Sequence, residues 1–450
     1  DILEVMFGVV KSGACVVPIS GLLTADQMGH LLLDSGASVI IASPEYIERL
    51  DQQRGQLADV AADHWIVVHG YSDGWRPYED WLSGVSIDTP KVTYQPEDDF
   101  NIIYSSGTTG LPKGIVQAHR ARSHWAVSNA IEMGFRDHSR ALTTTSLYSN
   151  GTWLMMLPVL FAGGTCVVMP SFDPGAFLDA LDNERITHTF MVPAQFIAVL
   201  EMPPRRANAA TNLEVVLCAG SPLRRDTKRK AIALFGPVLY ELYGFSEGFS
   251  TMLKPSSPAD KFHTVGTPVL GFDVRILNDD GDVLAAGEVG EIAGYGAGML
   301  SRYHGRPDAT EAMVWKDERG RTFVRSGDIG YLDEDGFLIL VDRKKDMIIS
   351  GGFNVFPADI EAIIGTHPGV LDCTVIGIAH PKWGETPLAL VIRKTGIEIP
   401  SDDLIVWCNE RLAKHQRITA LEWRESFPRN ALGKVLKREL RSAYEGATDV

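Results

Sequence analysis

The chain has 450 residues, 45% of them hydrophobic and 22% charged, which is long enough for at least two domains with large cores and is typical of a globular protein. Its formal net charge of -15 argues against a nucleic-acid partner, which would need a basic face, but allows a nucleotide substrate, which needs only a few local cations. The five cysteines are scattered and form no Cys-x-x-Cys pair, so we expect no disulfide framework, no zinc site and a reducing, cytoplasmic location.

The first two-thirds of the chain alternate helical and extended patterns. Residues 2–11 and 24–35 have apolar residues at helical spacing, and Thr24 and Asp26 are candidate N-caps of the second helix. Short apolar runs predict strands at residues 14–18, 38–42, 65–68, 164–169, 188–192 and 215–219. Continuous apolar strands between helices indicate an α/β domain with a largely parallel sheet that helices cover on both faces.

The longest apolar stretch, residues 153–169, is divided by Pro158 and by Gly163-Gly164. It is short for a membrane span and predicts a buried helix followed by a strand. A peripheral membrane contact would need a basic amphipathic helix, and none is evident. We therefore expect no integral membrane contact.

The pattern changes after Phe272. Short strands at residues 273–277, 291–294 and 337–341 are separated by turns rich in Asp and Gly, which predicts a small antiparallel, β-barrel-like subdomain. A compact α+β module follows from about Lys345, with helices at residues 357–364 and 401–412 and strands at 373–378 and 388–392. The candidate junction is the turn-flanked Asp342-Arg343-Lys344-Lys345.

The most informative segment follows the apolar residues 102–103, which end a predicted strand. It contains three glycines, four Ser or Thr hydroxyls and one lysine, in the order Tyr104-Ser105-Ser106-Gly107-Thr108-Thr109-Gly110-Leu111-Pro112-Lys113-Gly114. Glycines let backbone N–H groups close on an anion, hydroxyls donate to phosphate oxygens, and the lysine adds positive charge. The spacing is not that of a Walker A loop, but the segment predicts a phosphate-binding loop.

Further motifs follow the phosphate loop. They are Ala219-Gly220-Ser221-Pro222-Leu223, Tyr240-Glu241-Leu242-Tyr243-Gly244-Phe245-Ser246-Glu247, Tyr303-His304-Gly305-Arg306-Pro307, Arg325-Ser326-Gly327-Asp328-Ile329-Gly330-Tyr331, residues 342–361 and Pro428-Arg429-Asn430-Ala431-Leu432-Gly433-Lys434. In this order the set resembles the signature motifs of the adenylate-forming superfamily, which includes acyl-CoA synthetases, luciferases and the adenylation domains of peptide synthetases. The resemblance spans nearly the whole chain.

The resemblance implies an ATP and AMP site. Its residues are Ser105, Ser106, Gly107, Thr108, Thr109, Gly110, Lys113, Gly220, Ser221, Tyr243, Gly244, Ser246, Asp328 and Arg343. An aromatic residue before Gly244 can stack on adenine, and the acceptor-only carboxylate of Asp328 suits the two ribose hydroxyls. Arg343 would contact ribose or phosphate. Glu247 would hold the Mg²⁺ that bridges the ATP phosphates.

The resemblance also implies a division of labour between two domains. Residues 1–344 would form the AMP-binding domain and residues 345–450 a small mobile domain that pivots at Lys345. Gly351-Gly352 would line a channel for CoA, since no side chain obstructs it there. The catalytic residues would be Lys434, Thr109 and Glu247, with the Lys434 ammonium bridging the substrate carboxylate and the α-phosphate.

The sequence departs from the family pattern in two places. The family often begins some tens of residues earlier, so we expect the usual first segment to be missing here. The aromatic-His-x-x-Gly element reads Leu147-Tyr148-Ser149-Asn150-Gly151, with Tyr148 in the place of the histidine. The expected acyl pocket is mostly apolar, with Gly151 leaving room for length, and it consists of Tyr148, Asn150, Gly151, Trp153 and Val192.

The predicted function follows from the motifs and from the pocket. With no aspartate near residues 146–151 to pair with a substrate ammonium, a fatty or aromatic acid is favoured over an amino acid. We expect this acid to be converted to acyl-AMP with release of pyrophosphate and then to acyl-CoA, with Arg224, Arg225 and residues 228–230 as candidate contacts to the CoA phosphates. The alternatives are a carrier protein or oxygen as acceptor, or a degenerate nucleotide-binding relative. A homodimer is a further expectation from the resemblance.

Overall fold

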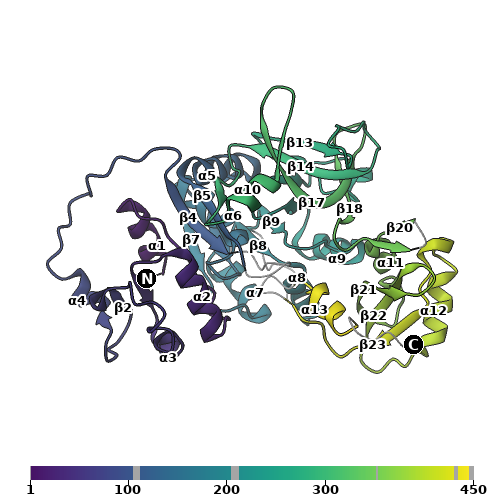
Figure 1. The fold of residues 1–450 in the computed structure, drawn as a ribbon, viewed down its shortest axis with the longest axis horizontal. Coiled ribbons are helices and arrows are strands. Elements are labelled where there is room, and N and C mark those ends of the chain that lie inside the picture. The colour runs from purple at the N-terminus through teal and green to yellow at the C-terminus, as the bar shows by residue number, and fades with distance from the viewer. Residues whose placement is uncertain (1, 105–111, 204–211, 351–352, 430–433, 445–450) are drawn as a thin grey trace.

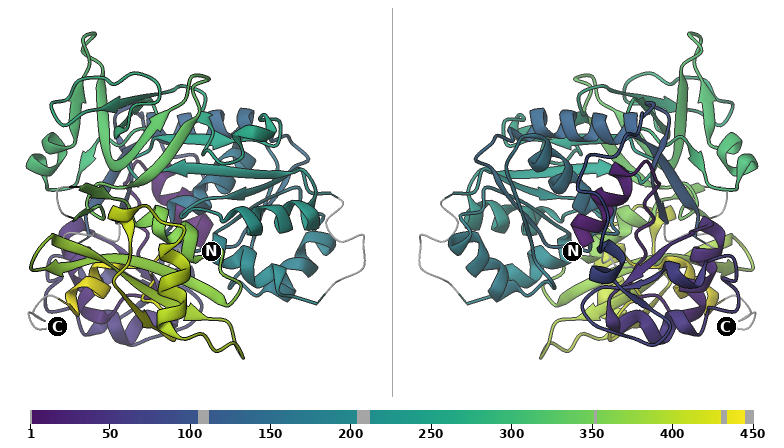
Figure 2. Two further views of the ribbon diagram at one scale, coloured as in Figure 1. Left: turned by 90° about the vertical axis from the view of Figure 1, so that its right-hand side faces the viewer. Right: turned by 90° about the vertical axis from the view of Figure 1, so that its left-hand side faces the viewer.

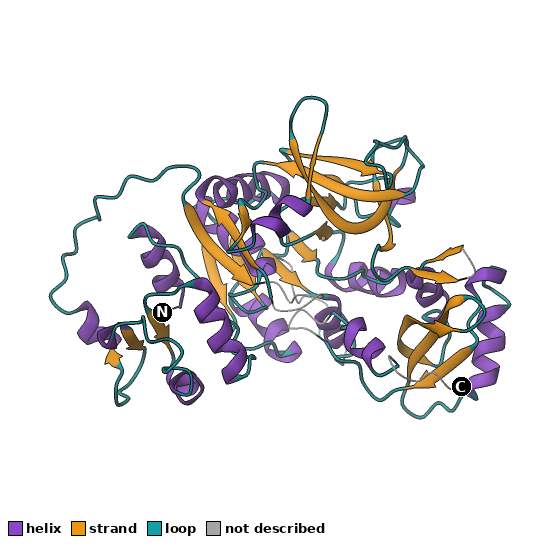
Figure 3. Ribbon diagram, in the orientation of Figure 1, coloured by secondary structure: helices purple, strands orange, loops and turns teal. Residues whose placement is uncertain are grey.

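A computed structural model describes residues 2–104, 112–203, 212–350, 353–429 and 434–444 of the chain (Figure 1). It has a large N-terminal domain built on sheets and a smaller C-terminal domain, as expected. Figure 3 shows the small domain at one end of the molecule and the N-terminal helices at the other. Among the described residues no helix is long and apolar enough to cross a membrane.

The N-terminal segment forms a small unit beside the large sheet. Helices α2 (Ala25–Ser35), α3 (Ile47–Asp51) and α4 (Tyr78–Leu82) accompany the parallel strands β1 (Ile40–Ala42), β2 (Trp65–Val67) and β3 (Arg76–Pro77), whereas α1 (Ile2–Lys11) packs through Met6 into the core of the large sheet. Thr24 caps α2, because its hydroxyl accepts from Gln27 N at 3.3 Å while the Gln27 side chain accepts from Thr24 N at 3.0 Å.

The strand predicted at residues 14–18 is wrong. In this segment Val16 makes an isolated bridge to Asn101, donating to Phe100 O at 3.1 Å and accepting from Ile102 N at 3.0 Å. Gly13, with φ of 84°, turns the chain just before the bridge, and Pro18 has no N–H with which to extend the pairing.

The central element is a seven-stranded sheet with strand order β12-β11-β10-β9-β8-β6-β7. Five strands are parallel, which confirms the largely parallel sheet: β6 (Arg140–Thr143), β7 (Thr165–Val168), β8 (His188–Met191), β9 (Val215–Cys218) and β10 (Leu239–Gly244). Of these, β7, β8 and β9 lie where strands were predicted, whereas β6 and β10 were not predicted as strands. Two antiparallel strands extend one edge, β11 (Ser250–Leu253) and β12 (Thr267–Pro268).

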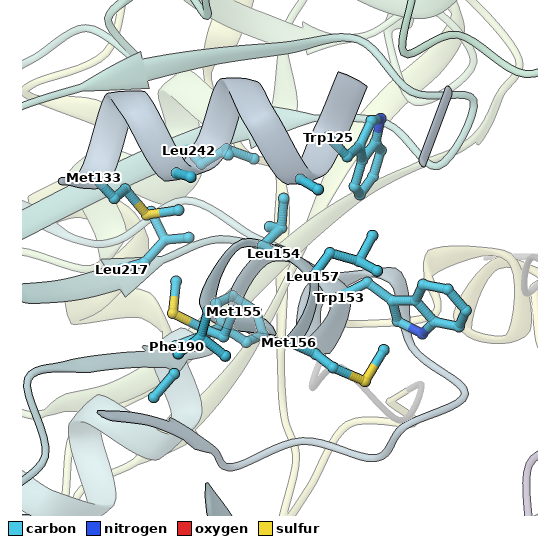
Figure 4. Packing of buried hydrophobic residues seen from close by; sticks show 14 of the residues in the cluster. Trp125, Met133, Trp153, Leu154, Met155, Met156, Leu157, Phe190, Leu217 and Leu242 are labelled. Carbon is cyan, nitrogen blue, oxygen red and sulfur yellow. The ribbon is translucent and has the colours of Figure 1, made fainter. Parts of the chain in front are cut away.

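Both faces of this sheet are buried, because successive residues of one strand enter different cores. Val215 and Leu217 of β9 pack with α5 (His119–Met133) and α6 (Asn150–Phe161), a core that Figure 4 shows around Trp125 and Trp153. Val216 and Cys218 of the same strand pack on the other face, against α7 (Pro174–Asn183), α8 (Pro193–Leu200) and α9 (Arg225–Phe235). The predicted two-faced burial is confirmed.

The phosphate loop lies between two antiparallel strands, β4 (Asp99–Tyr104) and β5 (Gly114–Ala118). Tyr104 and Gly114 face each other at the loop's ends, and β15 (Arg302–Tyr303) pairs with the other edge of β5. The pairing of β15 with β5 brings Tyr303 next to the loop's C-terminal end.

The antiparallel subdomain predicted after Phe272 is confirmed. Its strands are β13 (Phe272–Leu277), β14 (Gly290–Gly296), β16 (Val314–Lys316), β17 (Thr322–Leu332) and β18 (Leu338–Arg343), with α10 (Pro307–Ala312) beside them. The backbone of Val265 and Gly266, between β11 and β12, exchanges hydrogen bonds with Leu338 of β18 at 2.9 and 2.8 Å. The seven-stranded sheet and the antiparallel sheet are joined by this short pairing.

The C-terminal domain is α+β, as predicted. Its strands are β19 (Ile348–Ser350), β20 (Phe353–Val355), β21 (Val370–His380), β22 (Gly384–Arg393) and β23 (Ala420–Trp423), and its helices are α11 (Pro357–Ile364), α12 (Ser401–Asn409) and α13 (Lys437–Ser442). Helix α12 is shorter than predicted, because the Asn409 amide turns to pair with both backbone groups of Ile418 at 2.9 Å. Figure 2 shows this domain packed against the large one.

We expect Gly266→Ala to loosen the joint between the two sheets. A Cβ at this left-handed position (φ 83°) would lie 2.0 Å from the Met252 backbone, whereas one at Gly36 (φ 65°) would meet nothing within 4 Å. Gly36→Ala should cost about 1 kcal/mol for the backbone conformation alone, and Gly266→Ala about 1–3 kcal/mol more for the clash. Urea denaturation of both variants measures the difference, and equal losses would contradict the assigned role of Gly266.

Candidate active site

Part of the predicted site lies outside the described residues. This holds for most of the phosphate loop and for the two glycines expected along the CoA channel. The residues concerned are Ser105, Ser106, Gly107, Thr108, Thr109, Gly110, Gly351 and Gly352. Their roles stay predictions.

Two adjacent parallel strands end at the predicted nucleotide site. Gly220 and Ser221 follow β9, and β10 ends at Gly244, two residues before Ser246. Because β9 and β10 pair in parallel, these segments meet at one edge of the sheet, where open α/β sheets bind ligands. A Cβ at Gly244 would lie 2.5 Å from the Phe249 carbonyl oxygen, so the backbone there has no room for a side chain.

Asp328 is brought together with Tyr243 and Arg343. The Tyr243 hydroxyl donates to Asp328 Oδ2 at 2.9 Å, and Arg343 Nε lies 3.4 Å from Oδ1. Burial, followed by the Asp328 charge, raises the pKa of Tyr243 well above its usual value, so the hydroxyl stays a donor. Asp328 and Arg343 face each other across β17 and β18, and this register sets their approach.

Lys434, from the C-terminal domain, reaches the same place. Burial and then the positive charge of Arg343 lower the pKa of its ammonium to about 7, although Asp328 and Asp346 oppose the shift. These charge effects link the lysine electrostatically to Asp328, the carboxylate that Tyr243 and Arg343 contact. The structure thus joins two predicted site residues that are separated by more than a hundred positions in the sequence.

Glu247 is linked to the end of the phosphate loop through Tyr303. The Tyr303 hydroxyl donates to Glu247 Oε1 at 2.5 Å, and Lys113 Nζ lies 4.8 Å from the centre of the Tyr303 ring. Burial and the Glu247 charge raise the pKa of Tyr303. No cluster of three metal-binding side chains occurs among the residues that the structure describes. A single carboxylate nevertheless fits Mg²⁺, which usually keeps several waters and binds substrate phosphates.

A buried arginine that the motif analysis did not identify lies beside β4. Arg122 of α5 is 1% exposed, and it donates to Asn101 Oδ1 and to Asn150 Oδ1, each at 2.7 Å. Its guanidinium carbon lies 4.8 and 4.4 Å from the ring centres of Trp125 and Trp153. Burial lowers its pKa to about 9, and its Nη1 has no hydrogen-bond partner in the described parts of the chain.

The arginine supports the backbone at Ser246. The Ser246 carbonyl accepts from Asn150 Nδ2 at 3.3 Å and from Gln117 Nε2 at 3.1 Å. Gln117 also faces Asn101 across β4 and β5. These polar side chains, which we call the Arg122 network, therefore hold the segment that precedes Glu247. The signal in the sequence that could have identified Arg122 is its helical spacing from Trp125, because residues three apart lie on one face of α5.

The predicted acyl-pocket residues differ in their surroundings. Val192 and Trp153 are 5% and 1% exposed, and Trp153 belongs to the core in Figure 4, where its Nε1 donates to Leu147 O at 2.9 Å. Gly151 leaves no room for a longer acid, contrary to expectation, because a Cβ there would lie 2.6 Å from the Phe190 ring. The Tyr148 hydroxyl is buried and unpartnered within the described residues.

Several contacts hold the predicted junction. Asp342, at the end of β18, accepts from the backbone N of Ala358 in α11 at 2.9 Å, and burial raises its pKa. Arg441 of α13 donates to the carbonyl oxygen of Lys345 at 3.2 Å and pairs with Asp346 at 3.1 Å. Lys345 itself has an exposed side chain. Of the basic residues expected to meet CoA, Lys228 is buried in an ion pair with Glu241.

Comparison with known proteins supports this site. A family model described as AMP-binding enzyme matches residues 1–304, and one described as AMP-binding enzyme C-terminal domain matches residues 359–434. Neither match tests the boundary at residues 344 and 345, which stays a prediction.

Three relatives are similar over nearly the whole chain. A feruloyl-CoA synthase of Amycolatopsis is 33% identical, over 98% of this chain and 86% of its own. A long-chain-fatty-acid–CoA ligase of Mycobacterium tuberculosis, FadD13, is 32% identical, over 97% and 85%. A fatty acid–[acyl-carrier-protein] ligase of Streptomyces coeruleorubidus, ScoC, is 30% identical, over 98% and 84%.

Solved structures share the fold along its full length. ATP-bound MatB of Rhodopseudomonas palustris is 26% identical, with a TM-score of 0.90 over 100% of this chain and 87% of its own. Apo MatB, at 25% identity and the same coverage, gives a TM-score of 0.76. With two family models matched in the expected order, the first of them over residues 1–304, the chain belongs to the AMP-binding enzyme family of the adenylate-forming superfamily.

Proposed function

We propose that this chain is an AMP-forming acid–thiol ligase, which activates a carboxylic acid with ATP and transfers the acyl group to the thiol of CoA. The observation that carries the proposal is that Lys434 of the small domain interacts electrostatically with Asp328 and Arg343 of the large domain, which lie 3.4 Å from each other. A lysine withdrawn from water where two domains meet is suited to stabilise charge that develops on a phosphoryl group. The names of the feruloyl-CoA and fatty-acid relatives support the same reaction class.

The first half-reaction is attack by the acid's carboxylate on the α-phosphate of ATP, which forms acyl-AMP and releases pyrophosphate. Asp328 would accept from the ribose hydroxyls, as an acceptor-only group can. Lys113 and residues 105–111 would hold the β- and γ-phosphates. Lys434 would stabilise the charge on the α-phosphoryl oxygens. Glu247 would bind Mg²⁺, which when present neutralises phosphate charge.

The second half-reaction is attack by the CoA thiol on the acyl-AMP, which releases AMP. For this step the C-terminal domain would pivot at Lys345, withdraw Lys434 and bring Gly351-Gly352 to the CoA channel. The higher TM-score against ATP-bound than against apo MatB supports the view that the structure has the arrangement for the first half-reaction.

The acid is proposed to be aromatic or a fatty acid. The apolar surroundings of Trp153 and Val192 support this, as do the names of the feruloyl-CoA synthase and the long-chain-fatty-acid–CoA ligase. A carrier protein is the second candidate acceptor, because ScoC is named for that activity. A homodimer and a cytoplasmic location stay predictions from the family resemblance and from the scattered cysteines.

The test is pyrophosphate release with a panel of aliphatic and aromatic acids, followed by AMP release with and without CoA in the absence of carrier protein. We expect release with at least one acid and CoA-dependent turnover.

Lys434→Ala should lower acyl-AMP formation about a hundredfold, ~3 kcal/mol, and leave thioester formation from supplied acyl-AMP intact. Equal loss of both half-reactions would contradict the role of Lys434, and no release with any acid would contradict the ligase.

The pH dependence of adenylation should report the Lys434 ammonium. Its pKa of about 7 means that the cation is present below pH 7 and is lost as the pH rises in the substrate-free enzyme. The kcat/KM for ATP should therefore fall through pH 7, because this parameter reports groups of the free enzyme. In Lys434→Arg the guanidinium stays charged over this range and the inflection should disappear. Persistence of the inflection would assign it to another group.

We expect Arg122→Met to lower the activity of the folded protein as well as its stability. The change removes the hydrogen bonds that hold Asn150 beneath Ser246, so pyrophosphate release should fall about tenfold, the equivalent of ~1.4 kcal/mol. The free energy of unfolding should also fall by about 1–3 kcal/mol, because Asn101 Oδ1 and Asn150 Oδ1 lose their donor, so release is measured per folded protein under conditions in which the variant stays folded. Arg120→Met, which removes a half-buried arginine of the same helix that pairs with Glu97, is the control. If activity falls only as folded protein is lost, the Arg122 network serves folding alone.

A further inference from the structure

One carboxylate of the C-terminal domain binds arginines from both domains. Asp372 of β21 pairs through Oδ1 with Arg224 Nη2 at 2.9 Å and through Oδ2 with Arg429. The backbone N of Cys373 donates to Oδ1 at 2.9 Å and orients the carboxylate. We call Arg224, Asp372 and Arg429 the arginine clasp.

The two arginines belong to the two segments that adenylation has to bring together. The segment between β9 and α9 contains Gly220 and Ser221. Arg224 is its last residue, directly before α9. Arg429 precedes Lys434 by five positions, on the segment that carries the lysine. Asp372 therefore connects the nucleotide side of the large domain to the lysine segment of the small domain through one side chain.

The Arg224 side chain makes further contacts with the small domain. Its Nη1 donates to Leu371 O at 3.4 Å, and its guanidinium carbon lies 3.4 Å from the position that a Cβ at Gly365 would take. The glycine thus leaves space for the arginine between α11 and β21. These contacts assign Arg224 to the domain interface rather than to the CoA phosphates expected from the sequence.

We propose that Asp372 is a positioning residue for adenylation, which holds the Lys434 segment against the nucleotide segment through the arginine clasp. The inference rests on the proposed role of Lys434. The clasp acts on the balance between two domain arrangements, since a pivot that withdraws Lys434 carries Asp372 away from Arg224. Partly exposed ion pairs are individually weak, and the one pair that crosses the domains, Arg224 with Asp372, should bias this balance by about two- to fivefold.

The test compares the two half-reactions in the full-length enzyme. Asp372→Asn keeps the side-chain volume and an acceptor for Cys373 N but removes the charge. It should lower kcat/KM for pyrophosphate release about two- to fivefold, as expected for one ion pair between the domains, while thioester formation from supplied acyl-AMP and CoA stays unchanged or becomes faster. Arg224→Gln should also lower pyrophosphate release. The double variant should lose no more activity than the more affected single variant, because both substitutions remove the same contact.

Arg417→Gln is the matched control, since this arginine of the small domain is exposed and has no role in the proposed site. It should leave both half-reactions and the melting temperature unchanged. Increasing ionic strength should lower adenylation by the wild type more than by Asp372→Asn, because salt screens the pairs that the variant lacks. A general loss of folding would instead lower both half-reactions together with the melting temperature.

The outcomes separate this inference from the proposed function. If the wild type releases pyrophosphate and Lys434→Ala loses only adenylation, but Asp372→Asn behaves like the wild type or loses both half-reactions equally, the arginine clasp has no positioning role. If the double variant shows additive losses, the two residues act separately and the clasp is also overturned. If Lys434→Ala adenylates normally, the proposed role of the lysine fails first.

Discussion

The geometry of the site depends on Asp328. Its carboxylate accepts from Tyr243 at the end of the seven-stranded sheet and pairs with Arg343 at the end of the antiparallel sheet, which holds the two sheets together where the nucleotide is expected. Lys434 of the small domain interacts electrostatically with the same carboxylate. Three parts of the fold therefore meet at one acceptor-only group. Most other contacts of the site hold one of these three parts in place.

Positive charge is concentrated locally in a chain of strongly negative net charge. Arg343 and Lys345 both lower the pKa of Lys434, so the site without ligand disfavours a charged ammonium there. A polyphosphate would reverse this effect, because an anion beside the lysine favours its protonated form. Arg122 is a second cation, whose burial costs solvation free energy. Its guanidinium contacts amide oxygens and two indole rings instead of an anion. Both cations indicate that the site is organised around charge carried by its ligands.

The sequence analysis succeeded where one local pattern was enough. The buried strands β8 and β9, the capped helix α2 and helix α11 lie where their patterns predicted, since apolar runs and capping residues act over a few positions. It was wrong at residues 14–18, where an apolar run makes one bridge, and at Gly151, whose space is filled by Phe190. In both places the outcome depends on which distant segment packs against the residue.

The sequence by itself determined the family, the reaction class expected from it and the residues that carry the motifs, because each motif is a short run whose chemistry can be recognised without its neighbours. The tertiary structure alone decided that Tyr243 binds Asp328 across 85 positions, that Arg224 binds Asp372 across 148, and that Arg122 lies beneath Ser246. These contacts join strands, helices and domains that only folding brings together. The sequence around a single arginine or tyrosine does not indicate which distant residue it contacts, since these contacts depend on sheet register and domain packing.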